Sequence, residues 1–206
     1  MSVKVLGIST SPRAGGNSDL LLRRALEGAE SAGARIEYIH LTDYNVGPCI
    51  ECNACYVTGR CVVEDDYQQL LEKLLNTDRL IFATPIFFMT VCAHAKMLID
   101  RGQCLWAHQY VLKKKLFSSE RDRRAMVIAV GGSKSTKQFD SVRRTMKAYF
   151  DTLQIKYVAG IFVNQIDEPG DTEKHPSALK EAFRLGAVLA AANAPLPQKP
   201  DDIELT

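Results

Sequence analysis

Residues 3–18 read VKVLGISTSPRAGGNS, a short apolar run that passes directly into a loop rich in serine and glycine. The run from Val3 to Ser9 is apolar at its centre, which is typical of a buried strand. Leucine and alanine then recur at helical spacing over residues 18–33, so we expect a helix capped by Asn17 or Ser18. A buried strand, a short loop and a helix form the first half of a βαβ unit, and this start predicts an α/β protein.

The same alternation of apolar runs and amphipathic stretches continues along the chain. Further strands are expected at residues 35–41, 80–84 (stopped by Pro85), 125–130 and 157–163, and further helices after Asp65-Asp66 and at 93–106, 136–153 and 177–192. This pattern predicts a three-layer doubly wound α/β fold whose five-stranded parallel sheet has the order 2-1-3-4-5. We expect one domain over residues 1–194 and a C-terminal tail, 195–206, that lies over the surface or a partner subunit.

Ligands of such sheets bind beyond the carboxyl ends of the strands, so the loop over residues 9–18 is the first candidate site. The backbone N–H groups of a helix N-terminus favour an anion, and the hydroxyls of the loop add donors. The loop has neither the G-x-x-x-x-G-K-[ST] nor the G-x-G-x-x-G pattern, which leaves a single phosphomonoester as the preferred ligand and a turn without a ligand as the alternative. The candidate residues are Ser9, Ser11, Pro12, Arg13, Asn17 and Ser18.

Two further loops lie at the same edge of the expected sheet. The run Pro85, Ile86, Phe87, Phe88, Met89 is unusually apolar for a surface loop, so we expect a flat ring such as an isoalloxazine, or another subunit, to cover it. The alternative is that the aromatic side chains fill the core. Gly131, Gly132 and Ser133 form the third loop, where glycine allows a ligand to approach the backbone closely.

Four cysteines, Cys49, Cys52, Cys55 and Cys61, have the spacing C-x2-C-x2-C-x5-C. Three thiolates at intervals of three residues, with a fourth on a short tether, suit one 4Fe-4S cluster. Structural zinc is an alternative, although zinc sites usually draw their cysteines from two separated pairs. A redox dithiol is a further alternative that would leave two thiols without a role. Cys92 and Cys104 stand in apolar surroundings and are interpreted as small buried residues.

Composition excludes several classes of partner. The chain has 206 residues, with 26 basic and 24 acidic side chains and a formal net charge of +2, which gives no basic field for nucleic acid. The first residues show no signal-peptide pattern, and no apolar run approaches the roughly 18 to 20 residues of a membrane span. We therefore expect a cytoplasmic protein, with no nucleic-acid and no membrane partner, whose thiols stay reduced.

Taken together, these motifs resemble those of the flavodoxin-like NAD(P)H-dependent FMN reductases and, within them, the iron–sulfur flavoproteins. The resemblance extends from Val3 to about Asn164. It rests on Gly7-x-Ser9-x-Ser11-Pro12-Arg13 with Asn17-Ser18, the four-cysteine motif followed by Asp65-Asp66, Thr84-Pro85-Ile86, Lys96-x-x-x-Asp100-Arg101 and Val130-Gly131-Gly132. The resemblance implies FMN, with its phosphate on the first loop and its ring on the second. It also implies a homodimer or homotetramer in which the cluster lies near the flavin across a subunit contact.

The preferred function is therefore electron transfer by a flavin-dependent oxidoreductase that couples FMN to a 4Fe-4S cluster. Its electron donor or acceptor would be NAD(P)H, a ferredoxin-like carrier or a quinone. One alternative is an NAD(P)H-dependent FMN or quinone reductase without a cluster. Another is a flavin- or zinc-binding protein without catalytic turnover.

Overall fold

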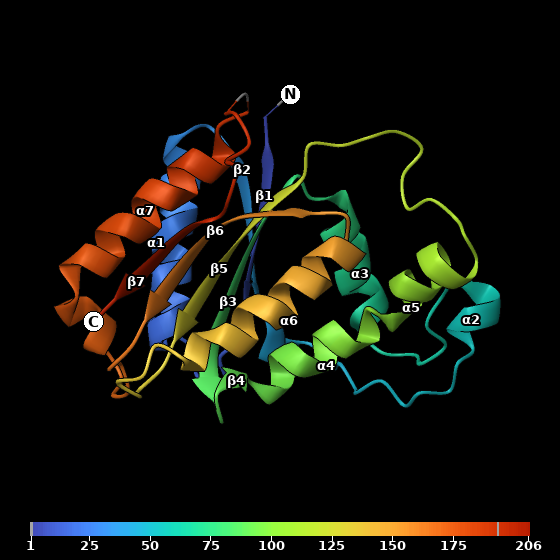
Figure 1. Cartoon of the computed structure of the whole chain (residues 1–206), viewed down its shortest axis with the longest axis horizontal. Coiled ribbons are helices and arrows are strands. Elements are labelled where there is room, and N and C mark those ends of the chain that lie inside the picture. The colour runs from blue at the N-terminus through green and yellow to red at the C-terminus, as the bar shows by residue number, and fades with distance from the viewer. Residues whose placement is uncertain (1, 193) are drawn as a thin grey trace.

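A computed structural model describes residues 2–192 and 194–206, and its centre is a parallel sheet (Figure 1). Strand β1 (Lys4–Ser9) pairs with β2 (Arg35–His40) on one side and with β3 (Arg79–Phe87) on the other. Strands β5 (Arg124–Val130), β6 (Lys156–Val163) and β7 (Asp201–Leu205) extend the sheet beyond β3. Across the described residues the order is β2-β1-β3-β5-β6-β7, and the short β4 (Thr90–Val91) pairs antiparallel with the end of β3.

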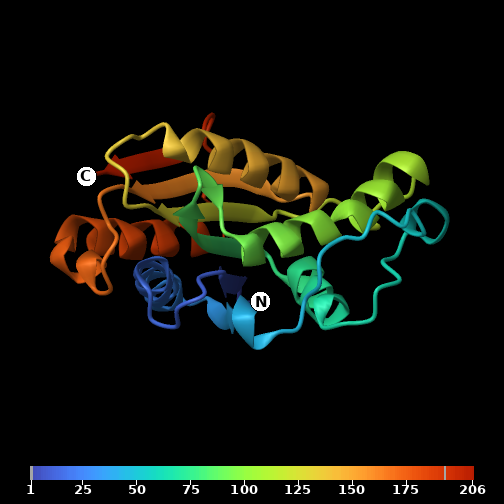
Figure 2. The same cartoon turned by 90° about the horizontal axis from the view of Figure 1, so that it is seen from below.

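Helices cover both faces of this sheet, as the view from below shows (Figure 2). Helices α1 (Asn17–Ser31) and α7 (Pro176–Ala190) pack on one face, and α3 (Tyr67–Asn76), α4 (Ala93–Arg101) and α6 (Gln138–Thr152) pack on the other. The backbones of helices α1 and α7 approach each other closely at Gly28 and Gly186. A Cβ atom added to Gly28 would lie 2.0 Å from the carbonyl oxygen of Phe183, and one added to Gly186 would lie 1.9 Å from that of Ala25. Only glycine permits this approach of two helix backbones.

Short helical segments make up most of the remaining regular structure. These are η1 (Leu41–Asp43), α2 (Cys55–Thr58), α5 (Gln103–Trp106), the π-helical turn η2 (Ala107–Val111) and η3 (Asp171–Lys174). Helix α2 and the end of α5 lie at one end of the molecule, beyond α3 and away from the main sheet (Figure 1). In the part of the chain that the structure describes, no helix is long and apolar enough to cross a membrane.

The expected five-stranded sheet in the order 2-1-3-4-5 is corrected to the arrangement above, because two strands were missed. Strand β3 does not stop before Pro85 but continues to Phe87, where it turns back into β4. The missing N–H of Pro85 costs little there, since β1 ends opposite Ala83 and no longer pairs with this part of β3. The N-cap of α1 is Gly16 rather than Asn17 or Ser18.

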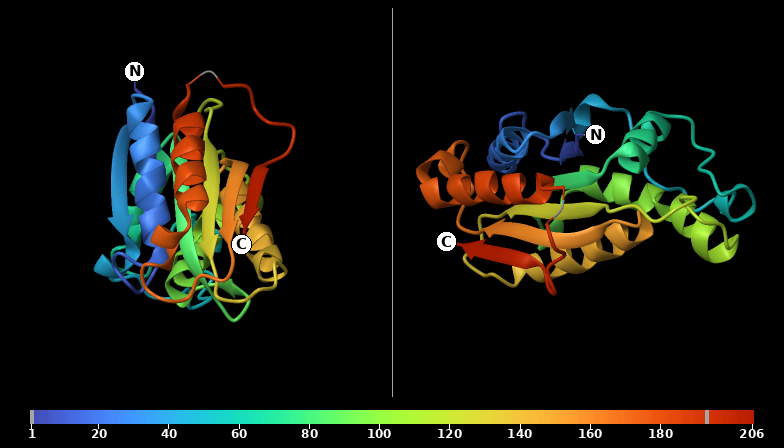
Figure 3. Two further views of the ribbon diagram at one scale, coloured as in Figure 1. Left: turned by 90° about the vertical axis from the view of Figure 1, so that its left-hand side faces the viewer. Right: turned by 90° about the horizontal axis from the view of Figure 1, so that it is seen from above.

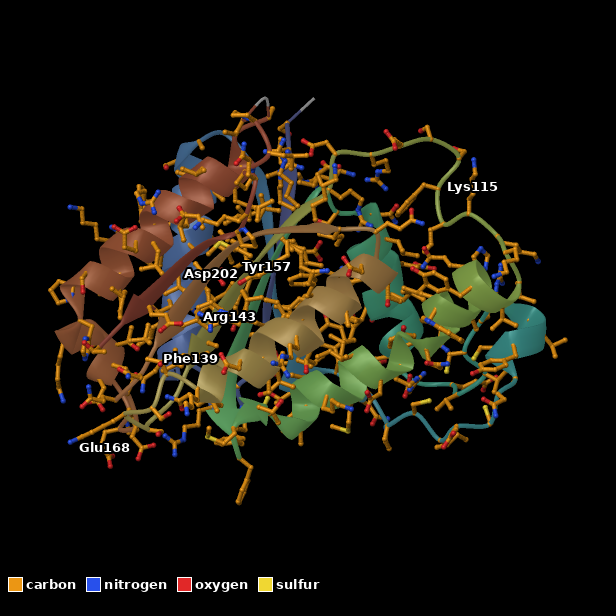
Figure 4. The ribbon with its side chains drawn as sticks, viewed as in Figure 1. Lys115, Phe139, Arg143, Tyr157, Glu168 and Asp202 are labelled. Carbon is orange, nitrogen blue, oxygen red and sulfur yellow. The ribbon has the colours of Figure 1, made fainter. Side chains whose placement is uncertain are left out.

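The second missed strand is β7, which belongs to the segment that we expected to lie over the surface or a partner subunit. It pairs in parallel with β6 at the edge of the sheet (Figure 3). Figure 4 shows the side chains that fasten it: Arg143 of α6 and Tyr157 of β6 both point to Asp202. The Arg143 Nε–H donates to Asp202 Oδ2 at 2.9 Å, and the Tyr157 hydroxyl donates to Asp202 Oδ1 at 2.5 Å. Residues Asp201–Leu205 of the tail thus form a strand of the main sheet.

Candidate functional site

The loop between β1 and α1 is shaped by hydrogen bonds that bring its backbone close to the start of the helix. The Arg13 N–H donates to Ser11 Oγ at 3.0 Å, and the Gly16 N–H donates to the Arg13 carbonyl at 3.1 Å. A Cβ atom on Gly16 would lie 3.0 Å from Ser11 Oγ, so the turn is tight enough to favour glycine. The first N–H groups of α1 have no partner within the helix, which leaves them available for an anion.

The side chain of Asp19, in the first turn of α1, binds the backbone of this loop. Its carboxylate is fully buried and accepts hydrogen bonds from the Gly15 N–H, from Arg23 and from the Tyr38 hydroxyl. Burial by itself would raise the pKa of Asp19, but these hydrogen bonds lower it below its ordinary value. Gly15 has a φ of 69°, a conformation that suits glycine, and its N–H is the one that Asp19 binds. Asp19 therefore helps to fix the conformation of the loop.

Two buried hydroxyls near this loop have no hydrogen-bond partner within the described residues. They are Ser9 Oγ, at the end of β1, and Ser18 Oγ, in the first turn of α1. Leaving a buried polar group unpaired costs about 1–3 kcal/mol, so such groups are uncommon without a reason. An anionic ligand at the helix N-terminus would give the Ser18 hydroxyl an acceptor. This observation supports an oxyanion at the start of α1.

Asn17 plays a different part from the one that its position in the motif suggests. Its side-chain Nδ2 donates to the Glu168 carbonyl at 2.8 Å, and its Oδ1 accepts from the Thr172 N–H at 3.2 Å. The amide therefore ties the loop after β6 to the first turn of α1. That loop also contributes Asp167 and Pro169 to the wall of a cavity that Ser11, Arg13 and Ser18 line.

One cavity gathers most of the residues expected to bind the flavin. It is lined by Ser11, Pro12, Arg13, Asn17, Ser18, Pro85, Ile86, Phe87, Gly131 and Gly132. The other expected residues, Ser9, Phe88, Met89 and Ser133, do not line it. Sequence reasoning missed Gly16, Val130, Ile166, Asp167 and Pro169, which also line it. Three separate segments meet here because β1, β3 and β5 are adjacent and parallel, so their carboxyl ends share one edge.

The β3–β4 hairpin projects beside this cavity. Phe88 and Met89 at its tip both have left-handed backbone conformations, with φ values of 47° and 65°. Phe87, Phe88 and Met89 are all exposed, so the aromatic side chains do not fill the core. Exposed apolar side chains on a conformationally costly turn are typical of a surface that contacts a ligand or another protein chain.

The four cysteines of the motif line a second cavity, of about 320 Å³, which shares no lining residue with the first. Glu51 and Asn53, on either side of Cys52, have φ values of 53° and 57°, and this local winding turns the loop around the cavity. Cys104 of α5 is buried and lines the same cavity, which its apolar surroundings in the sequence did not indicate. Within the described residues, no three His, Cys, Asp or Glu side chains stand close enough together to hold a metal ion.

A buried ion pair lies against this cavity. Both side chains of the pair, Arg101 at the end of α4 and Asp65 before α3, are almost fully buried. Arg101 Nη1 donates to Asp65 Oδ2 at 2.6 Å and Nη2 donates to Asp65 Oδ1 at 3.1 Å. Burial alone would raise the pKa of Asp65, but the hydrogen bonds from Arg101 and from two backbone N–H groups lower it. The Arg101 Nε–H is directed to Cys61 Sγ at 3.2 Å.

The model of the NADPH-dependent FMN reductase family matches residues 3–166. The chain belongs to this family, and it is therefore a flavin-dependent oxidoreductase of the NAD(P)H:acceptor type with FMN as the family's cofactor. This membership favours an enzyme over the non-catalytic binding protein considered above.

Two archaeal relatives are iron–sulfur flavoproteins. That of Methanocaldococcus jannaschii is 32% identical over 196 residues, covering 91% of this chain and 96% of the relative. That of Archaeoglobus fulgidus is 30% identical over 190 residues, covering 92% of this chain and 80% of the relative. Among solved structures, the NAD(P)H:quinone oxidoreductase from Methanothermobacter marburgensis superposes with a TM-score of 0.68 at 19% identity, over 91% of this chain and 98% of that one. The superposition shows that the two proteins share the flavodoxin-like fold.

Proposed function

We propose that this protein is an iron–sulfur flavoprotein, which binds FMN in the cavity at the carboxyl ends of β1, β3 and β5 and a 4Fe-4S cluster in the cysteine cavity. When bound, FMN would accept an electron pair from a nicotinamide donor, and the cluster would supply one-electron transfer to an acceptor. The observation that carries the proposal is that all four motif cysteines line one cavity, beside a buried arginine that donates to one of their thiols.

The residues of the first cavity suit FMN. The phosphate would lie at the N-terminus of α1, where Ser18 Oγ is buried with no partner in the part of the chain that the structure describes, and where Ser11 and Arg13 line the wall. Arg13 is exposed and could supply a cation to a phosphate from the solvent side. The ring would lie against Pro85, Ile86 and the glycines after β5. Asn17 would act indirectly, because its amide is already bonded to the loop after β6.

The residues of the second cavity suit a thiolate-bound cluster in their chemistry. Four thiols from one short loop could close the coordination sphere of a single cluster, and the left-handed residues within the loop allow the chain to wrap around it. A cluster supplies a one-electron carrier when it is bound. The protein's own part is to keep Cys61 in place through Arg101 and to present the site at the end of the molecule where α2 lies.

One observation favours a reductase without a cluster. Within the described residues the thiols are not gathered into a ready metal site. A relative from Bacillus subtilis, 30% identical over 184 residues and covering 89% of this chain and 96% of itself, is provisionally named an NAD(P)H-dependent FMN-containing oxidoreductase. In that case the cysteines would stabilise the loop or stay free, and electrons would pass from the flavin directly to a quinone or a free flavin.

Metal analysis of anaerobically purified protein separates the two functions. We expect about four irons and four acid-labile sulfides per chain, with a broad absorption band in the visible range beside that of FMN. Cys61→Ala should lower the iron content. Cys92→Ala is the matched control, because Cys92 is buried but does not line the cysteine cavity, and its iron content should equal that of the parent.

Stoichiometric zinc without iron, or flavin alone with no bound metal, would contradict the cluster and leave the plain reductase. Air oxidises exposed cluster sites, so the protein must be kept anaerobic for the count to be decisive.

A further inference from the structure

The guanidinium of Arg101 is held by more of the protein than an ion pair requires. Besides the two hydrogen bonds to Asp65, Nη1 donates to the Gly47 carbonyl at 3.2 Å, Nη2 donates to the Val63 carbonyl at 3.1 Å, and Nε donates to Cys61 Sγ at 3.2 Å. A guanidinium has five N–H donors, and all five are therefore used. The group also lies over the ring of Tyr67, 4.4 Å from its centroid.

The direction of each hydrogen bond gives the arginine two functions. Four donors are satisfied by oxygen atoms at the two ends of the cysteine loop, Gly47 before it and Val63 and Asp65 after it. These contacts clamp the ends of the loop together. The fifth donor, Nε–H, points into the cavity at a sulfur atom. An arginine that only held the ends of the loop together would need only the four contacts to oxygen atoms.

We propose that Arg101 is a positioning residue for the iron–sulfur site, which orients Cys61 and raises the reduction potential of the cluster through a charge-assisted hydrogen bond to its sulfur. This inference rests on the cluster of the proposed function. Reduction adds one electron, delivered from the flavin, and so adds one negative charge to a thiolate-bound cluster. A buried cation that donates to one of the sulfurs favours the reduced form, because hydrogen bonds to sulfur and nearby charge are the protein's main means of setting the potential.

Asp65 keeps Arg101 from being an isolated buried charge and sets its orientation. The bidentate contact fixes the plane of the guanidinium, which in turn fixes the direction of the Nε–H. Lysine cannot reproduce this arrangement, since an ammonium has three donors without a fixed plane. The Arg101→Lys variant therefore keeps the positive charge and loses the directed hydrogen bond.

The test is a redox titration of anaerobic protein in which the flavin and cluster bands are followed separately. The double variant Asp65→Asn/Arg101→Gln removes both charges and avoids leaving either one unpaired in the interior. We expect its cluster to be at least about tenfold harder to reduce than that of the parent, a shift of about 59 mV to more negative potential for one electron. Arg101→Lys should shift the potential in the same direction by less, and the flavin potential should stay unchanged in both.

Arg143→Gln is the matched control, because Arg143 also makes ion pairs from a helix, with Asp202 and Glu204, but does not line the cysteine cavity. Its cluster potential should equal that of the parent. Parent-like potentials in variants that retain about four irons would overturn the inference. If the double variant does not fold, Arg101→Lys decides by the same measurement, and loss of iron from Arg101→Lys with FMN retained would support the positioning role. A parent that binds no iron would instead refute the proposed function itself.

Discussion

At the scale of single residues, the two cavities are marked by polar groups whose arrangement the fold alone does not explain. The Ser18 hydroxyl is buried with no partner among the described residues, although it could have been turned to solvent or replaced by alanine. Arg101 is buried with all five donors used, one of them on a sulfur atom. Buried polar groups cost stability unless they are paired, so the Ser18 hydroxyl indicates a bound group at the cavity that it lines. Arg101 is fully paired, and what singles it out is that one of its donors is directed to a cysteine sulfur.

Ser18→Ala should weaken FMN binding by about 1–3 kcal/mol, because the phosphate loses a buried donor. The apo-protein should be as stable as the parent or more stable, since the variant removes an unpaired hydroxyl. Fluorescence titration of apo-protein with FMN measures the affinity. The matched control is Ser31→Ala at the other end of α1, whose hydroxyl bonds to the Gly28 carbonyl. Equal losses for FMN and riboflavin would contradict a phosphate contact, because riboflavin has no phosphate.

At the scale of elements, the edge strand β7 shows how a charged segment enters a sheet. Its residues include Asp201, Asp202 and Glu204, a composition that does not predict a strand. Arg143 of α6 binds both Asp202 and Glu204, and its guanidinium lies 3.8 Å from the centroid of the Phe162 ring. The negative charges of these side chains also disfavour pairing of this edge strand with a strand of another chain.

Asp202→Ala should destabilise the protein by about 1–3 kcal/mol, because it removes the acceptor of the Tyr157 hydroxyl and one of the two acidic partners of Arg143 on β7, leaving Glu204 as the other. Asp201→Ala, at the neighbouring position of the same strand, is the matched control. Asp201 forms only a half-exposed pair with Arg184 at 3.3 Å, and its loss should cost no more than about 1 kcal/mol. Urea unfolding of the three proteins measures the difference. Equal losses in the two variants would show that β7 is held by its backbone pairing with β6 and not by the Asp202 contacts.

At the scale of the whole molecule, the two cavities are separated but joined by one helix. Helix α4 begins just after the β3–β4 hairpin, whose Phe87 lines the cavity at the carboxyl ends of β1, β3 and β5, and it ends at Arg101, beside the cysteine cavity. Its nine residues span roughly 13 Å at 1.5 Å per residue. A cluster near the flavin across a subunit contact, and a homodimer or homotetramer that would create this contact, stay predictions.

Cys52→Ala should separate the two halves of the proposed reaction. FMN should stay bound and be reduced by a two-electron donor at the parent's rate, because Cys52 does not line the flavin cavity. The output to one-electron acceptors should fall with the loss of the cluster. Stopped-flow reduction, followed at flavin and cluster wavelengths, measures both steps. One-electron output equal to that of the parent would leave the four cysteines with a structural role only.

Much of the fold could be predicted because it depends on local patterns. The strands at the centre of the sheet are short apolar runs, and the main helices carry their apolar residues at helical spacing, so each was recognisable from its own residues. Strand β7 was missed because its acidic residues are not typical of a strand and because its partners, β6 and Arg143, are far away in the sequence. Strand β4 was missed because a strand of two residues is too short to show an alternating apolar and polar pattern.

The candidate site divides in the same way. The amino-acid sequence by itself determined the alternation of strands and helices, the serine- and glycine-rich turn before α1 and the spacing of the four cysteines, because each of these is set by residues close together in the chain. Only the tertiary structure decided that the Asn17 side chain serves the loop after β6, that Asp167 and Cys104 line the two cavities, and that Arg101 donates to Cys61. The reason is physical: these contacts join segments up to about 150 residues apart, and hydrogen-bond partners at that separation are chosen by packing of the folded chain, which no local pattern encodes.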